Sequence, residues 1–272
     1  MSYGNFKPTI WSKYIEHELK KFTVFKEDCD YKFEGEAGKG KTVKILGVGK
    51  PNIGDYTGED IGAPEIVPDS SITLSIDQAK YFNFMVDDVD KAQAQDGLMN
   101  ALMEEATRAL AYEEDRFIGE QLAKNAGMVS ESLAIATEED AVKAVDDAFE
   151  YFWNNGVSNK DKVTIYVTPW FYNLFKNRIA TLKTDNDELI AKGVVGMYNS
   201  ARVKMSSFIF NDGTDDCMII KTSKGYAFCN GINETEAYRP EGLFSDAVKG
   251  LDTFGGKAVK PKEIYCIKAH KA

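Results

Sequence analysis

A single long amphipathic segment dominates the hydrophobic pattern of the chain and predicts one helix over Asp96–Gly127, ending on a glycine typical of a left-handed helix stop. Its apolar stripe consists of Leu98, Ala101, Leu102, Ala106, Ala109, Leu110, Phe117, Ile118 and Leu122. Opposite charges four residues apart favour the helix on its outer face: Glu104 with Arg108 and Glu120 with Lys124. At a rise of ~1.5 Å per residue it is roughly 45 Å long, about the width of a compact domain of this chain length. We therefore expect it to act as a strut along which other elements are arranged.

Residues 30–87 alternate between apolar and polar side chains, which is the pattern of β-strands. Strands are expected at Val43–Val48, Ile72–Ile76 and Tyr81–Val86, around a turn-rich stretch with three prolines and three glycines. Loops this long are uncommon in compact domains and are usually functional. The segment 30–87 has too few residues to cover both faces of a long β-hairpin within one subunit. We therefore expect the hairpin to lie on another molecule.

The remaining pattern is a mixture of helices and strands. An amphipathic helix over residues 9–25 forms an arm, which docks on its own chain or on a neighbouring subunit. Further helices are expected over Thr137–Asn155, stopped by Gly156, and from Pro169 onward. Strands are expected at 163–167, 204–210, 218–221, 226–229 and 263–267.

Composition narrows the function classes. The chain has 272 residues and a net charge of −10 at pH 7, without a block of lysine or arginine, which argues against direct nucleic-acid binding. Its apolar runs are far shorter than the ~20 residues of a membrane helix, and residues 1–21 hold no apolar signal-peptide core. Neither disulfides nor a metal cluster is expected of the four scattered cysteines, Cys29, Cys217, Cys229 and Cys266.

Gly35–Thr42 matches the phosphate-loop pattern G-x-x-x-x-G-K-[ST] letter for letter. A phosphate loop needs a buried strand before the glycines and a helix after Thr42, because the free N–H groups of that helix bind the phosphates. Residues 43–51 are β-branched and then interrupted by two glycines and a proline, and residues 29–34 are too polar for a central parallel strand. We therefore interpret Gly35–Thr42 as a hairpin bend, and a nucleotide hydrolase using this loop is the alternative.

Side chains for acid–base, nucleophilic or metal chemistry are scarce. The two histidines are His17 on the arm and His270 at the frayed end of the chain, so a catalytic triad or zinc site has almost no raw material. The acidic clusters lack the EF-hand pattern and are interpreted as solvated faces and turns: Glu113–Asp115, Asp146–Asp147 and Asp212–Asp216. We assign no catalytic, cofactor-binding or metal-binding residue and expect no enzyme.

The order of these elements resembles that of the major capsid proteins of tailed bacteriophages, the Hong Kong 97 type of fold. Two stretches carry the resemblance: Asp77–Ala94, which leads into the long helix, and Phe244–Ile267, which is similar to the closing segment of that family. The resemblance implies an α+β fold over essentially the whole chain. Its expected parts are an N-terminal arm (1–30), a β-hairpin extended loop (31–87), a peripheral domain with the spine helix (88–156), an axial domain (157–235) and a return segment to the peripheral domain (236–272).

The resemblance also implies a function. It predicts a structural protein that self-assembles, as pentamers and hexamers, into an icosahedral shell enclosing double-stranded phage DNA without sequence-specific binding or membrane contact. The expected location is the virion, after assembly in the bacterial host cytoplasm. A portal and a separate scaffolding protein are implied partners, because the arm begins too close to Met1 for a fused scaffolding segment. An encapsulin-like compartment that loads protein cargo is the alternative with the same fold.

Two expectations concern contacts between subunits. Some members of the family join subunits by a Lys–Asn isopeptide bond, for which Lys39, Lys41, Lys44 and Lys50 all lie on the extended loop. None of them is assigned, because the catalytic carboxylate and the partner asparagine cannot be placed. The charged outer face of the long helix, with Glu104 and Glu120, is predicted to face a neighbouring subunit or the shell interior.

Overall fold

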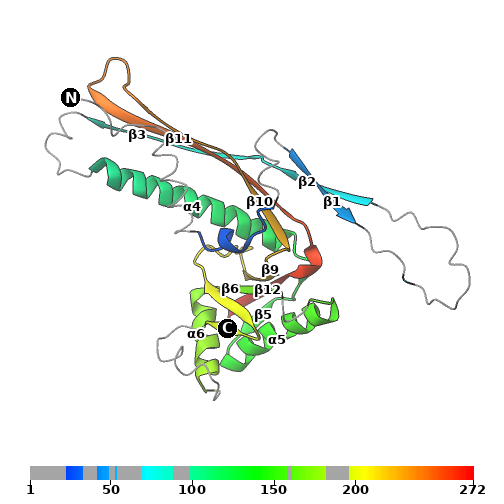
Figure 1. The fold of residues 1–272 in the computed structure, drawn as a ribbon. Coiled ribbons are helices and arrows are strands. Elements are labelled where there is room, and N and C mark those ends of the chain that lie inside the picture. Colours follow the sequence, from blue (N-terminus) through cyan, green and yellow to red (C-terminus); the bar gives the residue numbers. More distant parts are fainter. Residues whose placement is uncertain are drawn as a thin grey trace, which may run out of the picture.

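The structure, a computed structural model, describes residues 23–32, 42–48, 53, 69–87, 98–157, 161–181 and 196–272. It is an α+β fold, as predicted, with two larger sheets and a separate two-stranded hairpin. One sheet follows the long helix, and the other lies below it with two shorter helices (Figure 1). The predicted arm helix falls almost entirely on residues outside these ranges.

The long helix, α4, spans Leu98–Lys124 and confirms the central prediction. It runs along a three-stranded antiparallel sheet in the order β10-β11-β3, formed by Tyr226–Tyr238, Ser245–Ala258 and Gln78–Asp87 (Figure 1). Helix and sheet meet in an apolar cluster of Met103, Leu110, Ala111, Phe82, Phe84 and Val248. The sheet therefore has one face covered by α4 and one face turned away from it.

The predicted register of the helix is partly wrong. Leu110, Ile118 and Leu122 are buried as expected, whereas Ala101 and Ala109 are exposed. The buried stripe instead includes two carboxylates, since it consists of Met103, Thr107, Leu110, Ala111, Glu114, Asp115, Ile118, Leu122 and Ala123. Tertiary contacts to these acidic groups therefore decide which side of the helix faces inward.

The second sheet has seven strands in the order β4-β12-β9-β6-β8-β7, with β5 also paired to β12. In chain order they are β4 (Met128–Val129), β5 (Leu133–Ile135), β6 (Val163–Val167), β7 (Met197–Tyr198), β8 (Ala201–Met205), β9 (Asp216–Thr222) and β12 (Ile264–Lys271). Helices α5 (Glu138–Asn154) and α6 (Pro169–Thr181) share its main apolar core. A capping box between Thr137 and Asp140 begins α5, and Gly156, with φ +81°, follows its end as predicted.

Several strand expectations change in the structure. The predicted strand at 81–86 is β3, which pairs with β11 beside α4 and does not join the hairpin. The strand expected at 204–210 ends at Met205, and the one expected at 226–229 continues as β10 to Tyr238. Within the expected return segment, 236–272, β11 lies beside α4, whereas β12 pairs with β9 in the seven-stranded sheet. Pairing partners far apart in sequence determine these boundaries, and local alternation does not reveal them.

The hairpin strands β1 (Thr42–Val48) and β2 (Asp69–Ser75) pair antiparallel and project beyond the end of α4 (Figure 1). Val43, Ile45 and Leu74 are buried on the chain's own Ala227 and Cys229. Thr42, Lys44, Thr73 and Ser75 form the other, exposed face. Among its described side chains, the hairpin therefore buries one face within its own chain, in agreement with the prediction that it cannot bury both.

Gly127 follows the long helix for a different reason from the one predicted. Its backbone is not left-handed, since the positive-φ glycines among the described residues are Gly156, Gly213 and Gly242. A Cβ on Gly127 would instead lie 2.3 Å from the carbonyl oxygen of Pro261. The Gly127 N–H also donates to that oxygen at 2.9 Å. Close contact between the helix end and the 3-10 turn η2 (Pro261–Glu263) thus requires glycine.

Candidate functional sites

The phosphate-loop pattern lacks the structure that nucleotide binding needs. Thr42 is the first residue of strand β1 and pairs with Ser75, so a strand follows the motif where a helix would be required. Gly35–Lys41 lie outside the described residues. The described strand from Thr42 on supplies no helix N-terminus, whose free N–H groups a phosphate loop needs. This geometry contradicts the nucleotide-hydrolase alternative.

Ser132, Asp215 and His270 meet at the open edge of the seven-stranded sheet, a grouping that sequence reasoning missed. His270 lies within β12, paired with Ala134, and is not at a frayed end. Asp215 Oδ1 lies 2.7 Å from His270 Nδ1 and accepts a hydrogen bond of 2.9 Å from Ser132 Oγ. Ser132 Oγ approaches the same ring nitrogen, Nδ1, at 3.4 Å. In a catalytic triad the serine and the carboxylate contact opposite ring nitrogens, so this group is a structural contact that joins three segments.

The acidic cluster at Glu113–Asp115 was interpreted as a solvated face, and for two of its members that interpretation is wrong. Glu114 and Asp115 are 0 % exposed, whereas Glu113 is half-buried and pairs with Lys80 at 2.8 Å. In the other clusters Asp146 and Asp147 are exposed as expected, but Asp215 is buried. Glu114 and Asp115 are three or four residues from Ala111 and Ile118, so a helical period centred on those two residues would have identified them.

The buried carboxylates hold a short segment, residues 23–28, which we call the strap. Asp115 accepts hydrogen bonds from the N–H groups of Val24 at 2.6 Å and Phe25 at 3.1 Å. Lys26 Nζ contacts both oxygens of Glu114, at 2.7 and 2.9 Å, in a fully enclosed ion pair. A lone buried charge costs far more than a paired one, which explains why these groups occur together.

The far end of the strap is attached to the seven-stranded sheet. The Asp28 carboxylate pairs with Lys204 at 2.6 Å and accepts a hydrogen bond from the Tyr166 hydroxyl at 2.8 Å. Lys221 Nζ donates to the Asp28 carbonyl oxygen at 2.6 Å. Burial acts to raise the pKa of Asp28, but the hydrogen bonds from Lys204 and Tyr166 outweigh it and hold that pKa below its usual value. The strap therefore bridges α4 and the lower sheet.

Exposed apolar side chains gather on the strand face that is turned away from α4. Tyr81 is 79 % exposed and Met85 60 %, and they alternate along β3 with the half-buried Phe82 and Phe84 that face the helix. Leu251, opposite Tyr81 in the register, is 39 % exposed. Leu243 and Phe244, which precede β11, are also exposed. Clustered exposed apolar side chains are typical of protein–protein contact surfaces.

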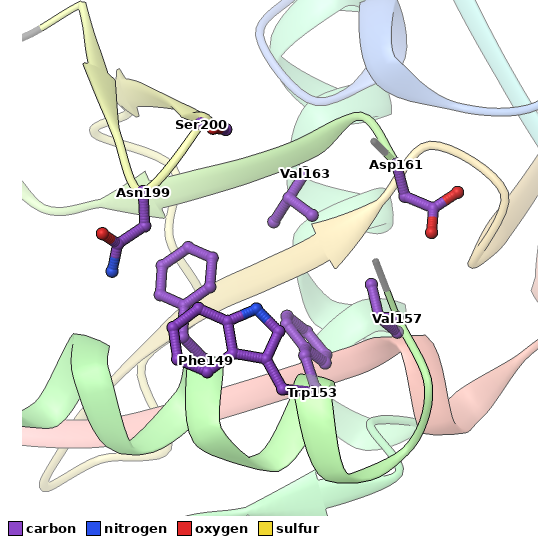
Figure 2. A pocket seen from close by; sticks show the side chains of 8 residues that line it. Phe149, Trp153, Val157, Asp161, Val163, Asn199 and Ser200 are labelled. Carbon is purple, nitrogen blue, oxygen red and sulfur yellow. The ribbon is translucent and has the colours of Figure 1, made fainter. Parts of the chain in front are cut away.

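The hollows on the described surface suit no sizeable ligand. One beside α5 measures about 10 Å³, near the volume of a single water molecule. Figure 2 shows its Phe149 and Trp153 rings below the strand that carries Val163, with the Asp161 carboxylate pointing away from the rings. A second hollow of about 210 Å³ lies between β3 and α4 and is lined by Gln78, Lys80, Glu113, Arg116, Phe117 and Glu120. Its lining is dominated by paired charges and offers no apolar binding surface.

Other kinds of site find little support in the described part of the chain. Its His, Cys, Asp and Glu side chains nowhere form a group of three or more placed to hold a metal ion. All four cysteines are buried free thiols. Of the helices that the structure describes, none is both long and apolar enough to cross a membrane.

Comparisons with known proteins address the fold as a whole. Neither a protein-family model nor a curated protein matches the sequence. Among solved structures, one from Mycobacterium phage Che8 is 28 % identical with a TM-score of 0.77, over 90 % of both chains. The capsid of cyanophage P-SCSP1u is 14 % identical with a TM-score of 0.75, over 92 % of this chain and 89 % of that chain. The chain has the phage capsid fold.

A virus-like particle from Pyrococcus furiosus also matches this capsid fold. It is 11 % identical with a TM-score of 0.60, and the match covers 93 % of this chain and 95 % of that chain. Nearly full coverage of both chains in each comparison places the whole molecule, and not a single domain, within the capsid fold. At these low identities the matches show a shared fold, and a shared fold does not by itself imply a shared site.

Proposed function

We propose that this chain is the structural major capsid protein of a tailed bacteriophage and that many copies assemble into an icosahedral shell around the phage genome. The observation that carries the proposal is a capsid fold over 90 % of the chain together with 28 % identity to the Mycobacterium phage Che8 chain. The surfaces described above agree with it, because they offer contact area and no enclosed reactive site. The mechanism is then formation of interfaces rather than catalysis.

The two sheets support a division into domains that differs from the expected one. We assign α4 and the three-stranded sheet to the peripheral domain, and the seven-stranded sheet with α5 and α6 to the axial domain. The sequence-based boundary lay at 156/157, but α5 shares its core with α6, β6 and β12. We therefore propose a boundary near Gly127, with β12 in the axial part.

Contacts between copies are proposed for two surfaces. The exposed face of β3, with Tyr81 and Met85, offers apolar area to a neighbouring subunit. The hairpin β1–β2 projects past the end of α4, where its exposed face is open to a neighbour. Each such contact is weak alone, but a closed shell repeats it many times. The proposal includes pentamers and hexamers, a portal and a separate scaffolding protein as partners, and assembly in the bacterial host cytoplasm.

An encapsulin-like compartment is the second candidate, since the virus-like particle from Pyrococcus furiosus shares the fold. The higher identity to a phage chain, 28 % against 11 %, favours the phage shell. The contents of purified particles distinguish the two candidates. Double-stranded DNA in particles isolated from a lysate is expected for a phage capsid, whereas a stoichiometric protein cargo identifies the compartment.

Electron microscopy of the purified protein, with its scaffolding protein supplied, tests shell formation directly. Closed particles of uniform diameter are the expected result. Persistence of monomers at high protein concentration, with scaffolding protein present, contradicts the proposal.

A further inference from the structure

Three carboxyl groups and one ammonium group are enclosed together where the strap lies against α4 and β11. Glu114 and Asp115 are fully buried, Asp252 is 2 % exposed and Lys26 is 4 % exposed. Lys26 Nζ contacts both oxygens of Glu114, and the buried Asp252 carboxyl lies near enough for its charge to act on Glu114. Asp252 Oδ2 has no hydrogen-bond partner in the described part of the chain. The site therefore encloses three carboxyl groups with the ammonium group of Lys26.

The charges of this cluster do not balance when every carboxyl group is ionised. Asp115 is stabilised by the N–H groups of Val24 and Phe25, and Lys26 is the cation in contact with Glu114, since Lys80, opposite Asp252 in the register, pairs with Glu113. Carboxylates enclosed together in a buried site repel each other, which favours a proton on one of them. The closed arrangement thus favours the binding of a proton.

The pKa values of all three carboxyl groups are raised, which is the direction that favours proton binding. Burial, with a contribution from the Asp252 charge, raises the pKa of Glu114 to about 7 against the opposing effect of Lys26. Burial also raises the pKa of Asp115 to about 6, although its backbone hydrogen bonds oppose the shift. The pKa of Asp252 is raised by burial as well.

Other charged groups near the strap belong to a separate set. They come from the strap and the residue after it, from the seven-stranded sheet, from β3 and from the outer side of the helix: Glu27, Asp28, Cys29, Tyr166, Lys204, Lys221, Lys80 and Glu113. On β10 the ring of Phe228 faces Lys26 Nζ at 5.1 Å, and the buried Tyr226 contributes a neutral hydroxyl. The Asp28 and Glu113 carboxyl groups have pKa values below their usual values, so they stay ionised where Glu114 titrates.

We propose that Glu114, Asp115 and Asp252 form a proton-controlled clasp that holds the strap on the spine helix tightly at acid pH and releases it as the pH rises toward neutrality. An acid whose pKa is higher in the closed state than in the open state stabilises the closed state below its ordinary pKa. That contribution is lost as the pH rises from the ordinary values, 4.5 for Glu and 3.8 for Asp, to about 7 and about 6. The clasp acts within a single chain and does not depend on shell formation.

Amide hydrogen exchange of the strap in the full chain provides the test, measured between pH 5 and 8 and corrected for the intrinsic exchange rate. Each proton released on opening increases the opening constant by about tenfold per pH unit. Protection of the Val24 and Phe25 amides is therefore expected to fall by at least about tenfold between about pH 5 and 7 and to level off above. Protection that is constant, or that rises with pH, overturns the proposal.

Two variants and a matched control show which group is responsible. Asp252→Asn removes one of the three buried carboxyl groups, so at pH 8 the strap of this variant is expected to be more protected than the wild-type strap at pH 8. Glu114→Gln is expected to flatten the profile further, but it removes the partner of Lys26 and so also tests folding. Glu113→Gln, one residue away and partly exposed, is the control and leaves the profile unchanged. A wild-type profile that survives Asp252→Asn contradicts the assignment, whether or not the protein forms shells.

Discussion

Two glycines that follow helices are required for different physical reasons, and the sequence alone does not separate them. Gly127 and Gly156 both follow long helices, and a pattern-based interpretation gives both the same role as left-handed stops. The structure separates them, since Gly156 has φ +81° with open space around its Cα and Gly127 has the Pro261 carbonyl in the place of a side chain. Glycine is required at one position for its backbone freedom and at the other for its small volume.

The two glycines therefore respond differently to substitution. Gly156→Asn keeps a residue that tolerates the left-handed region, so its unfolding free energy is expected to change by less than about 1 kcal/mol. Gly127→Asn places a Cβ against backbone and is expected to cost roughly 1–3 kcal/mol. Urea unfolding of the two variants beside the wild type measures both values. Equal effects would mean that the Pro261 contact does not determine the choice of glycine.

Asp28 gives the strap an opposite pH response at its other end. Its pKa is held below the ordinary 3.8, so the stabilisation from Lys204 and Tyr166 is complete above that value and is lost as the pH falls through the folded-state pKa. Asp28→Asn is therefore expected to be less stable than the wild type at pH 6, with the difference shrinking below about pH 4. Thermal unfolding of both proteins from pH 3 to 7 measures the difference. A stability difference between the two proteins that increases as the pH falls would contradict the role of the Asp28–Lys204 ion pair.

The spine helix, at the scale of elements, has an inner face that packs on β11 and β3 and an outer face of ion pairs. Arg108 pairs with both Glu104 and Glu105, and Lys124 pairs with Glu120 at 2.5 Å. Exposed pairs of this kind contribute only about 0.3–0.5 kcal/mol each to a single chain. Their contribution to an assembly is a separate question.

We predict that part of this outer face contacts a neighbouring subunit or the shell interior. The double variant Glu104→Lys and Glu120→Lys is then expected to lose most shell formation, while the unfolding free energy of the chain falls by no more than about 1 kcal/mol. Particle yield by electron microscopy and urea unfolding are measured together. Glu150→Lys, a substitution of the same type on the exposed face of α5, serves as the control. Normal particle formation by the double variant would show that this face of α4 is exposed to solvent and makes no contact that the shell needs.

The exposed side of β3 carries the complementary apolar prediction. The double variant Tyr81→Ser and Met85→Ser is expected to weaken each contact between copies by roughly 1–3 kcal/mol of binding free energy, because less apolar area is buried. Because both side chains are exposed, chain stability is expected to stay within about 0.5 kcal/mol while particle yield falls sharply. Ala79→Ser lies on the same strand and the same exposed face and is the control. Equal particle yields from the two variants would exclude this face as a contact surface.

Elements were predictable where the information is local. The periodicity of α4, the capping box of α5 at Thr137 and the β-branched run of β6 each lie within one short segment, and each predicted element is present. The partners of β3 and β12 were not predictable, because β11 and β9 are distant in sequence and alternation does not identify a partner. The burial of Glu114 likewise depends on Lys26, 88 residues away.

The strap connects the parts of the whole molecule. Apart from it, α4 approaches the lower sheet mainly through its C-terminal half, near Ile118 and Leu122. The strap adds an ion pair and backbone hydrogen bonds to each side, through Glu114 and Asp115 above and through Lys204 and Lys221 below. The order of elements, and with it the capsid fold, could be recognised from sequence, but this connection could not, because its charged residues look like ordinary surface groups.

The position of the strap along α4 has a mechanical consequence. Val24 is bound at Asp115, well inside the helix and away from both Leu98 and Lys124. A force that reaches Val24 therefore acts on the interior of α4. The component of that force across the helix axis bends the helix more than the same force would near either end. Under such a load the helix would curve about the region of Asp115, and the two sheets on either side of that region would tilt relative to each other.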